Sequence, residues 1–215
     1  MILTAAHVID NSQPEDLRFL FPPANTRTTL TYAEVQSLST VPAETIRWWV
    51  ELELGRIVSD PDLDLAAIEV SSDLDKQHSV CFADLIEGGQ TPPEGQNIII
   101  IGYPSKNSSW LEDEGPLYFP QVTRTQIQPS REIEGFDPDQ HFLASYNLEK
   151  LTPSGPEPHG ISGAAAWLPV EKESIIWHPG KEMAGVATTW YRRLGLMKVV
   201  RREAVEEFLI AKVLW

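Results

Sequence analysis

Short apolar runs rich in β-branched and aromatic residues recur along the chain, and Pro, Gly, Asn or Asp bounds each of them. Such runs are typical of β-strands joined by turns. The pattern predicts strands at residues 2–6, 48–54, 65–70, 97–102, 122–127, 163–167, 175–177 and 183–189. Alternating strand and helix patterns are absent, so the sequence predicts an all-β protein built as a sandwich or barrel.

Two segments show a helical pattern instead. The first is residues 32–38, with Thr31 as a candidate N-cap, and the second is residues 201–212. The second helix places its apolar residues on one stripe, namely Ala204, Val205, Phe208, Leu209 and Val213. We therefore expect a C-terminal helix that packs on the β body.

A boundary between two halves is predicted in residues 71–95. This segment contains Gly88-Gly89, Pro92-Pro93 and scattered charges, which is a linker composition. We expect residues 1–95 to form an N-terminal barrel with the linker, and residues 96–215 to form a second barrel with the terminal helix. Residues 129–140 and 153–160 are expected to be surface loops.

The composition of the chain argues against several classes of binding partner and of protein. The chain has 215 residues, 42% of them hydrophobic, and a formal charge of -14. No cluster of Lys and Arg is present to bind phosphates, which argues against a nucleic-acid partner. The single cysteine, Cys81, excludes an internal disulfide framework. The longest apolar runs are far shorter than a membrane span, and no basic segment followed by an apolar leader core opens the chain.

Three local motifs carry candidate chemistry. They are Leu3-Thr4-Ala5-Ala6-His7, Asp64-Leu65-Ala66-Ala67-Ile68 and Gly160-Ile161-Ser162-Gly163-Ala164, in that order along the chain. Together they supply an imidazole, a carboxylate and a serine between glycines. Nucleophilic acyl transfer needs this set: a hydroxyl, a base to take its proton, and an acid to orient the base.

The three motifs resemble those of trypsin-like (chymotrypsin-fold) serine peptidases, in which TAAH, an aspartate opening an apolar strand, and G-x-S-G occur in the same order. Residues 98–104, IIIIGYP, resemble the strand that opens the second barrel in bacterial, disulfide-free members such as the HtrA/Deg group. Residues 184–187 resemble the strand that follows the nucleophile. The resemblance implies two six-stranded antiparallel β-barrels, a C-terminal helix, and serine endopeptidase activity on polypeptides without a cofactor.

The same resemblance implies a role for each motif residue. His7 would be the general base, Asp64 its orienting carboxylate and Ser162 the nucleophile. The backbone N–H groups of Gly160 and Ser162 would form the oxyanion hole, because glycines beside the serine let these amides turn toward the developing charge.

The substrate cleft is expected near the nucleophile. Pro156 stands where trypsin carries its specificity-determining acid, and His159 is expected at the cleft edge. Thr188, Thr189 and Trp190 would line one wall of the primary pocket, which suggests a preference for small or apolar side chains. Ile161 stands where trypsin has the aspartate that receives a newly cleaved N-terminus, so activation of that kind is not expected.

The resemblance also bears on the start of the chain. In this family earlier strands of the first barrel precede the histidine strand, so we expect the first barrel to be incomplete at its N-terminus. Either Met1 is not the natural start, or the chain is a fragment or decaying copy, and a leader upstream would leave the compartment open. A non-catalytic peptide-binding or interaction module on the same fold, and an esterase with the same triad, are the alternatives. The oligomeric state stays open as well.

Overall fold

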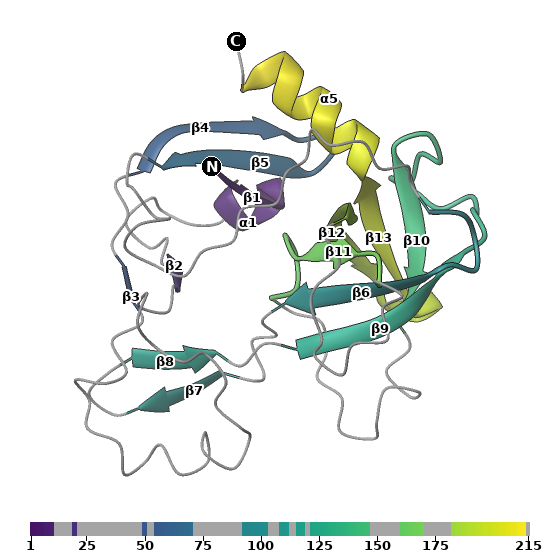
Figure 1. Ribbon diagram of the computed structural model, residues 1–215, viewed down its shortest axis with the longest axis horizontal. Coiled ribbons are helices and arrows are strands. Elements are labelled where there is room, and N and C mark those ends of the chain that lie inside the picture. The colour runs from purple at the N-terminus through teal and green to yellow at the C-terminus, as the bar shows by residue number, and fades with distance from the viewer. Residues whose placement is uncertain are drawn as a thin grey trace.

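The computed structural model describes residues 1–10, 19–20, 49–50, 54–70, 92–102, 108–111, 115–118, 121–146, 160–169 and 182–213. These residues are mostly β-structure, as the apolar runs predict. Figure 1 shows the C-terminal helix, α5 (Arg202–Lys212, yellow), at the top of the view between strands of the first half of the chain and strands of the second.

The first half of the chain contributes a three-stranded antiparallel sheet in the order β1-β5-β4. Its strands are β1 (Ile2–Thr4), β4 (Leu54–Asp60) and β5 (Leu65–Val70). A short helix, α1 (Ala6–Asp10), follows β1 directly. A separate pair joins β2 (Phe19–Leu20) to β3 (Trp49–Val50). The first four residues of β5 are all buried, which shows that both faces of this strand are covered there.

The second half forms a closed antiparallel barrel in the order β10-β13-β12-β11-β6-β9. Its strands are β6 (Asn97–Gly102), β9 (Gln121–Gln128), β10 (His141–Ser145), β11 (Ala165–Trp167), β12 (Met183–Tyr191) and β13 (Leu196–Arg201). A 3-10 turn at Arg192–Leu194 joins β12 to β13, and β7 (Ser108–Leu111) pairs with β8 (Gly115–Tyr118). Closure leaves the barrel without free sheet edges.

Two apolar cores hold these elements together. The first fills the barrel and contains buried residues such as Ile98, Ile100, Phe142, Met197 and Val199. The second lies between the barrel, α5 and the first sheet, and it contains Leu63, Leu65, Val186, Val200, Val205 and Phe208. The second core therefore joins the two halves of the chain into one packed unit.

Several predicted elements match the observed ones. The strands at residues 65–70 and 97–102 and the helix at the C-terminus are confirmed within a residue. The strand expected at residues 2–6 ends at Thr4, because Ala6 and His7 already belong to α1. Strands β10 and β13, and most of β4, were not predicted from the pattern. The helix expected at 32–38 and the strand expected at 175–177 lie outside the described residues.

Candidate active site

Asp64 has an unusual backbone conformation. Its φ is 57°, and it is the one non-glycine residue with a positive φ in the part of the chain that the structure describes. Aspartate tolerates this left-handed region better than most residues. The conformation turns Asp64 toward α1, where its backbone oxygen accepts a hydrogen bond from Ala6 N at 3.1 Å and its Oδ1 accepts one from His7 N at 3.1 Å. Asp64 thus satisfies amides at the start of the helix that carries His7.

The side chains of His7 and Asp64 form a close pair. His7 Nδ1 lies 2.8 Å from Oδ2 and 2.9 Å from Oδ1 of Asp64. The His7 side chain is 46% exposed and that of Asp64 is 17% exposed. Nδ1 faces a carboxylate, whose oxygens accept hydrogen bonds, so Nδ1 is the ring nitrogen that donates to Asp64. This arrangement orients an imidazole as a base.

Ser162 stands at the corner of a tight turn. Ala164 N donates to Ile161 O at 2.8 Å, which closes the turn, and Gly163 at its third position has a φ of 89°. This geometry is that of a type II turn, in which glycine is favoured at the third position. Gly163 N also donates to Ala187 O at 2.7 Å, which fastens the turn to β12.

The serine turn sits directly against the strand that leads to His7. A Cβ added at Gly163 would lie 3.0 Å from Thr4 Cα and 3.1 Å from Ala5 N, and it would also clash with Thr4 Oγ1. Only a residue without a side chain fits this contact. The first and third motifs, separated by more than 150 residues in the sequence, therefore meet in the structure.

The Ser162 hydroxyl donates to the backbone oxygen of Thr188 at 3.0 Å. The register between β12 and β13 shifts between Ala187 and Thr189, which leaves Thr188 as the extra residue of a β-bulge. The bulge frees the Thr188 carbonyl to accept this bond. Among the described residues no hydrogen bond joins Ser162 to His7.

The two amides expected to form the oxyanion hole lie on either side of a buried residue, Ile161. Gly160 has a φ of 90°, and Ile161 between Gly160 and Ser162 is buried in the barrel core. Within the described residues, the N–H groups of Gly160 and Ser162 donate no hydrogen bond to other protein groups. Oxyanion binding requires two N–H groups directed at one ligand oxygen.

The residues expected to line the cleft differ in exposure. Thr188 is 1% exposed, and its Oγ1 has no hydrogen-bond partner in the described parts of the chain. Thr189 and Trp190 are half-buried, and the Trp190 ring packs edge-on against Tyr146 at 6.4 Å between centroids. Pro156 and His159 lie outside the described residues.

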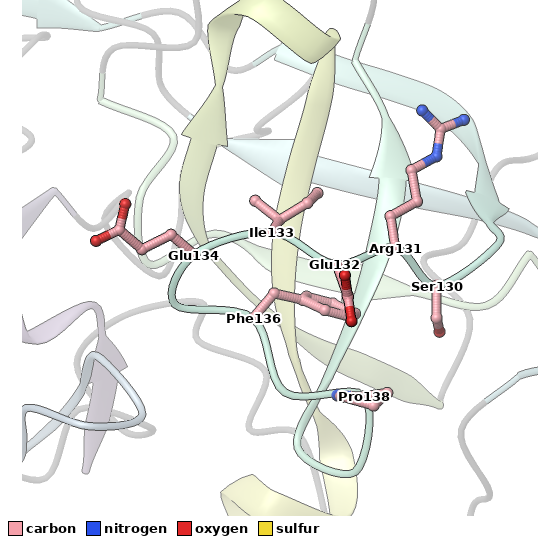
Figure 2. A pocket seen from close by; sticks show the side chains of 7 residues that line it. All are labelled: Ser130, Arg131, Glu132, Ile133, Glu134, Phe136 and Pro138. Atoms are coloured by element: carbon pink, nitrogen blue, oxygen red, sulfur yellow. The ribbon is translucent and has the colours of Figure 1, made fainter.

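A loop at residues 129–140, between β9 and β10, lies over the end of β12. Figure 2 shows its residues Ser130–Glu134, Phe136 and Pro138 around a surface hollow of about 540 Å³, in front of the yellow strands of the barrel. Tyr191 Oη donates to Glu134 O, and Lys198 Nζ donates to Gly135 O, both at 3.2 Å. The loop is thereby held to β12 and β13.

Two buried ionisable side chains lie under this loop. Burial, and secondarily the charge of Lys198, lower the pKa of His141 to about 4, and burial also lowers the pKa of Lys198. His141 is therefore neutral at pH 7. Neither residue is predicted as functional from the sequence, although Lys198 interrupts the apolar run at residues 196–200.

The described residues contain no group of three or more His, Cys, Asp or Glu side chains that could hold a metal ion. Among the described helices, none combines the length and the apolar character that crossing a membrane would need.

Comparison of the sequence with models of known families and with curated proteins finds no match. The structure, in contrast, is similar to solved structures of the trypsin/chymotrypsin fold. The scabies mite inactivated protease paralogue S-I1 has a TM-score of 0.58 at 14% identity, covering 97% of this chain and 81% of that chain. The scabies mite paralogue S-D1 has a TM-score of 0.50 at 15% identity, covering 97% and 82%. The chain therefore has the fold of trypsin-like serine proteases.

Proposed function

We propose that the protein is a serine endopeptidase that hydrolyses peptide bonds through His7, Asp64 and Ser162. The observation that carries the proposal is the contact between His7 Nδ1 and the Asp64 carboxylate at 2.8 Å, because two motifs 57 residues apart meet in the geometry of an oriented base. The close contact of Gly163 with Thr4 and Ala5 also supports the proposal, because it brings the serine turn beside the strand that leads to His7.

The proposed reaction follows from these positions. Ser162 Oγ attacks the carbonyl carbon of a peptide bond while His7 Nε2 takes the hydroxyl proton, and Asp64 stabilises the imidazolium that forms. The N–H groups of Gly160 and Ser162 stabilise the oxyanion. His7 then gives its proton to the leaving amine, and water releases the acyl group from Ser162 by the same steps. The proposed residues need no cofactor for this chemistry.

The proposal also covers the location of the site, the subgroup of proteases and the residues that contact the substrate. We place the catalytic residues between two halves, residues 1–95 and 96–215, because the second apolar core packs the two against each other. With Cys81 as its one cysteine, the protein would belong with bacterial, disulfide-free members of the trypsin-like group. Thr189 and Trp190 would contact the substrate at the cleft wall.

A second candidate is a peptide-binding or interaction module that retains the fold without catalysis. One observation favours it: Ser162 Oγ donates to Thr188 O, whereas no hydrogen bond links it to His7 among the described residues. Catalysis would require the hydroxyl to rotate from this carbonyl to Nε2. The two scabies mite proteins are themselves described as inactivated protease paralogues, which shows that this fold persists without activity.

Labelling with a fluorophosphonate separates the two candidates. An activated serine forms a covalent adduct with this probe, so we expect the unmodified protein to gain one label that Ser162→Ala abolishes. Ser130→Ala is the matched control, because Ser130 is exposed in the 129–140 loop and should label as the parent does. A folded protein that takes up no label supports the binding module. A label that survives in Ser162→Ala removes Ser162 from the proposed role.

A further inference from the structure

A turn at the centre of the 129–140 loop brings two apolar side chains together. Phe136 N donates to Ile133 O at 3.1 Å, and Gly135 between them has a φ of 72°, which is the geometry of a type II turn. The first and last residues of such a turn lie within about 7 Å of each other. Ile133 and Phe136 are both half-buried, so each keeps part of its apolar surface in contact with water.

Hydrogen bonds to the backbone hold this turn in place. Tyr191 Oη donates to Glu134 O, and the buried Lys198 donates through Nζ to Gly135 O, both at 3.2 Å. Both bonds end on carbonyl oxygens, so they fix the backbone of the turn and leave its side chains available to a partner. A surface whose backbone is already ordered loses less conformational entropy when it binds.

The apolar pair belongs to the surface hollow of about 540 Å³ on this loop. Binding sites for ligands commonly have volumes of about 300–1,000 Å³. In Figure 2 the side chains of Ile133 and Phe136 lie between Glu134 on one side and Arg131 on the other. Pro138 adds a third apolar side chain to the lining. The hollow therefore has room for an apolar side chain of a partner and offers it apolar contacts.

Acidic side chains dominate the charge around this hollow. The loop carries one cationic residue, Arg131, and four anionic residues, which are Glu132, Glu134, Asp137 and Asp139. Glu132 and Glu134 are exposed, and neither carboxylate has an ion-pair partner in the part of the chain that the structure describes. The whole chain is acidic as well, with a formal charge of -14, so its field attracts cationic partners.

We propose that the hollow at residues 130–138 is a docking site for a peptide segment of another protein in which lysine or arginine flanks an apolar side chain. The apolar side chain contacts Ile133 and Phe136, and the flanking cations pair with Glu132 and Glu134. An acidic segment is disfavoured, because the same carboxylates repel it. The inference goes beyond the proposed function and does not depend on it, since no lining residue of the hollow takes part in the proposed catalysis.

The test measures the affinity of defined peptides by fluorescence anisotropy. The protein is the full chain with Ser162→Ala, so that the peptide is not hydrolysed through the proposed nucleophile. The probe is a fluorescein-labelled peptide with two lysines on each side of a central phenylalanine and leucine. We expect it to bind about tenfold more tightly than a peptide with glutamates in place of the lysines, and about fivefold more tightly than one with two central glycines.

Charge variants of the protein locate the binding. Glu132→Gln combined with Glu134→Gln should weaken binding of the lysine peptide about fivefold, because two ion pairs are lost. Arg131→Gln in the same loop should strengthen it by about twofold, because a like charge is removed. The matched control combines Glu182→Gln with Glu207→Gln, which removes two exposed carboxylates outside the loop and should change the affinity by less than about twofold.

The proposal is overturned by any of three results. Equal losses of affinity in the loop variant and in the control variant would mean that the peptide responds only to net charge. Equal affinities for the peptides with apolar and with glycine centres would mean that the hollow contributes no apolar contact. Unchanged affinity in Glu132→Gln with Glu134→Gln would place the peptide elsewhere, the candidate active site included. Fluorophosphonate labelling reports on Ser162 alone, so the failure of one proposal is distinguishable from the failure of the other.

Discussion

Left-handed backbone at a few residues builds the candidate active site. Asp64 adopts it at a φ of 57° so that one residue can accept bonds from both the backbone and the ring of His7. Gly163 adopts it at 89° and lies against Thr4, where no side chain fits. The positive φ of Asp64, a residue with a Cβ, persists because the surrounding contacts hold it in place.

Gly163→Ala should destabilise the protein by about 2 kcal/mol or more, because the added Cβ meets Thr4 and also disfavours the positive φ. Gly135→Ala is the matched control. Gly135 has a φ of 72° but open space around the Cβ position, so we expect a loss of about 1 kcal/mol from conformation alone. Urea unfolding of both variants measures the difference. Equal losses would show that the contact with Thr4 is unimportant for stability.

Helix α5 joins the two halves of the chain. Its buried side chains Val205, Phe208 and Leu209 share a core with Leu65 of β5 and Val186 of β12. Polar contacts at its end reach β4: Lys212 Nζ lies 2.8 Å from Asp60 Oδ2, and Arg56 Nη2 donates to Val213 O at 2.6 Å. In Figure 1 the helix lies between the ends of β4 and β5 on one side and β13 on the other.

Truncation of Phe208 should weaken this connection. Phe208 is 3% exposed, and Phe208→Ala is expected to lower the free energy of unfolding by about 3 kcal/mol through lost burial and the cavity that remains. Ile210 is 54% exposed on the same helix, so Ile210→Ala should change stability by less than about 0.5 kcal/mol. Thermal unfolding compares the two. Similar Tm values would mean that α5 contributes little to the second core.

The whole molecule carries a formal charge of -14 at pH 7 around a neutral buried histidine, His141. Acidification reduces the mutual repulsion of surface carboxylates, which favours the folded state. It also protonates His141 in the unfolded chain before it does so in the folded one, which disfavours the folded state. The two effects act in opposite directions over the same pH range.

His141 should therefore make stability depend on pH. Burial lowers its pKa from the ordinary value of 6.5 to about 4, so the stability lost as pH falls from 6.5 to 4 is at most about 3 kcal/mol. His141→Gln removes the titrating group while its amide oxygen can still accept from Asp137 N. Unfolding measured at pH 7 and pH 4 should show a smaller loss in His141→Gln than in the parent. Identical losses of stability in the two proteins would exclude His141 as the source of the pH dependence.

Local pattern accounts for much of the fold. Residues 65–70 and 97–102 are continuous apolar runs between turn residues, and residues 202–212 repeat apolar residues at the helical period, so both kinds of element follow from the sequence. The same local reasoning fails at His7. No Gly, Pro, Asn or Asp in residues 2–6 marks the end of β1. Helix α1 begins there because Asp64, far along the chain, accepts its first amides.

The sequence determines which side chains are available for chemistry, since an imidazole, a carboxylate and a serine between glycines stand in three recognisable motifs. It also determines the β-rich character of the protein. How His7 and Asp64 are brought together depends on the antiparallel pairing of β1 with β5 and on the hydrogen bonds from the first amides of α1 to Asp64. This pairing could not be predicted, because the two motifs lie 57 residues apart and neither has a local feature that identifies the other as its partner. Strand pairing and burial across the core decide it, and both arise when the chain has folded.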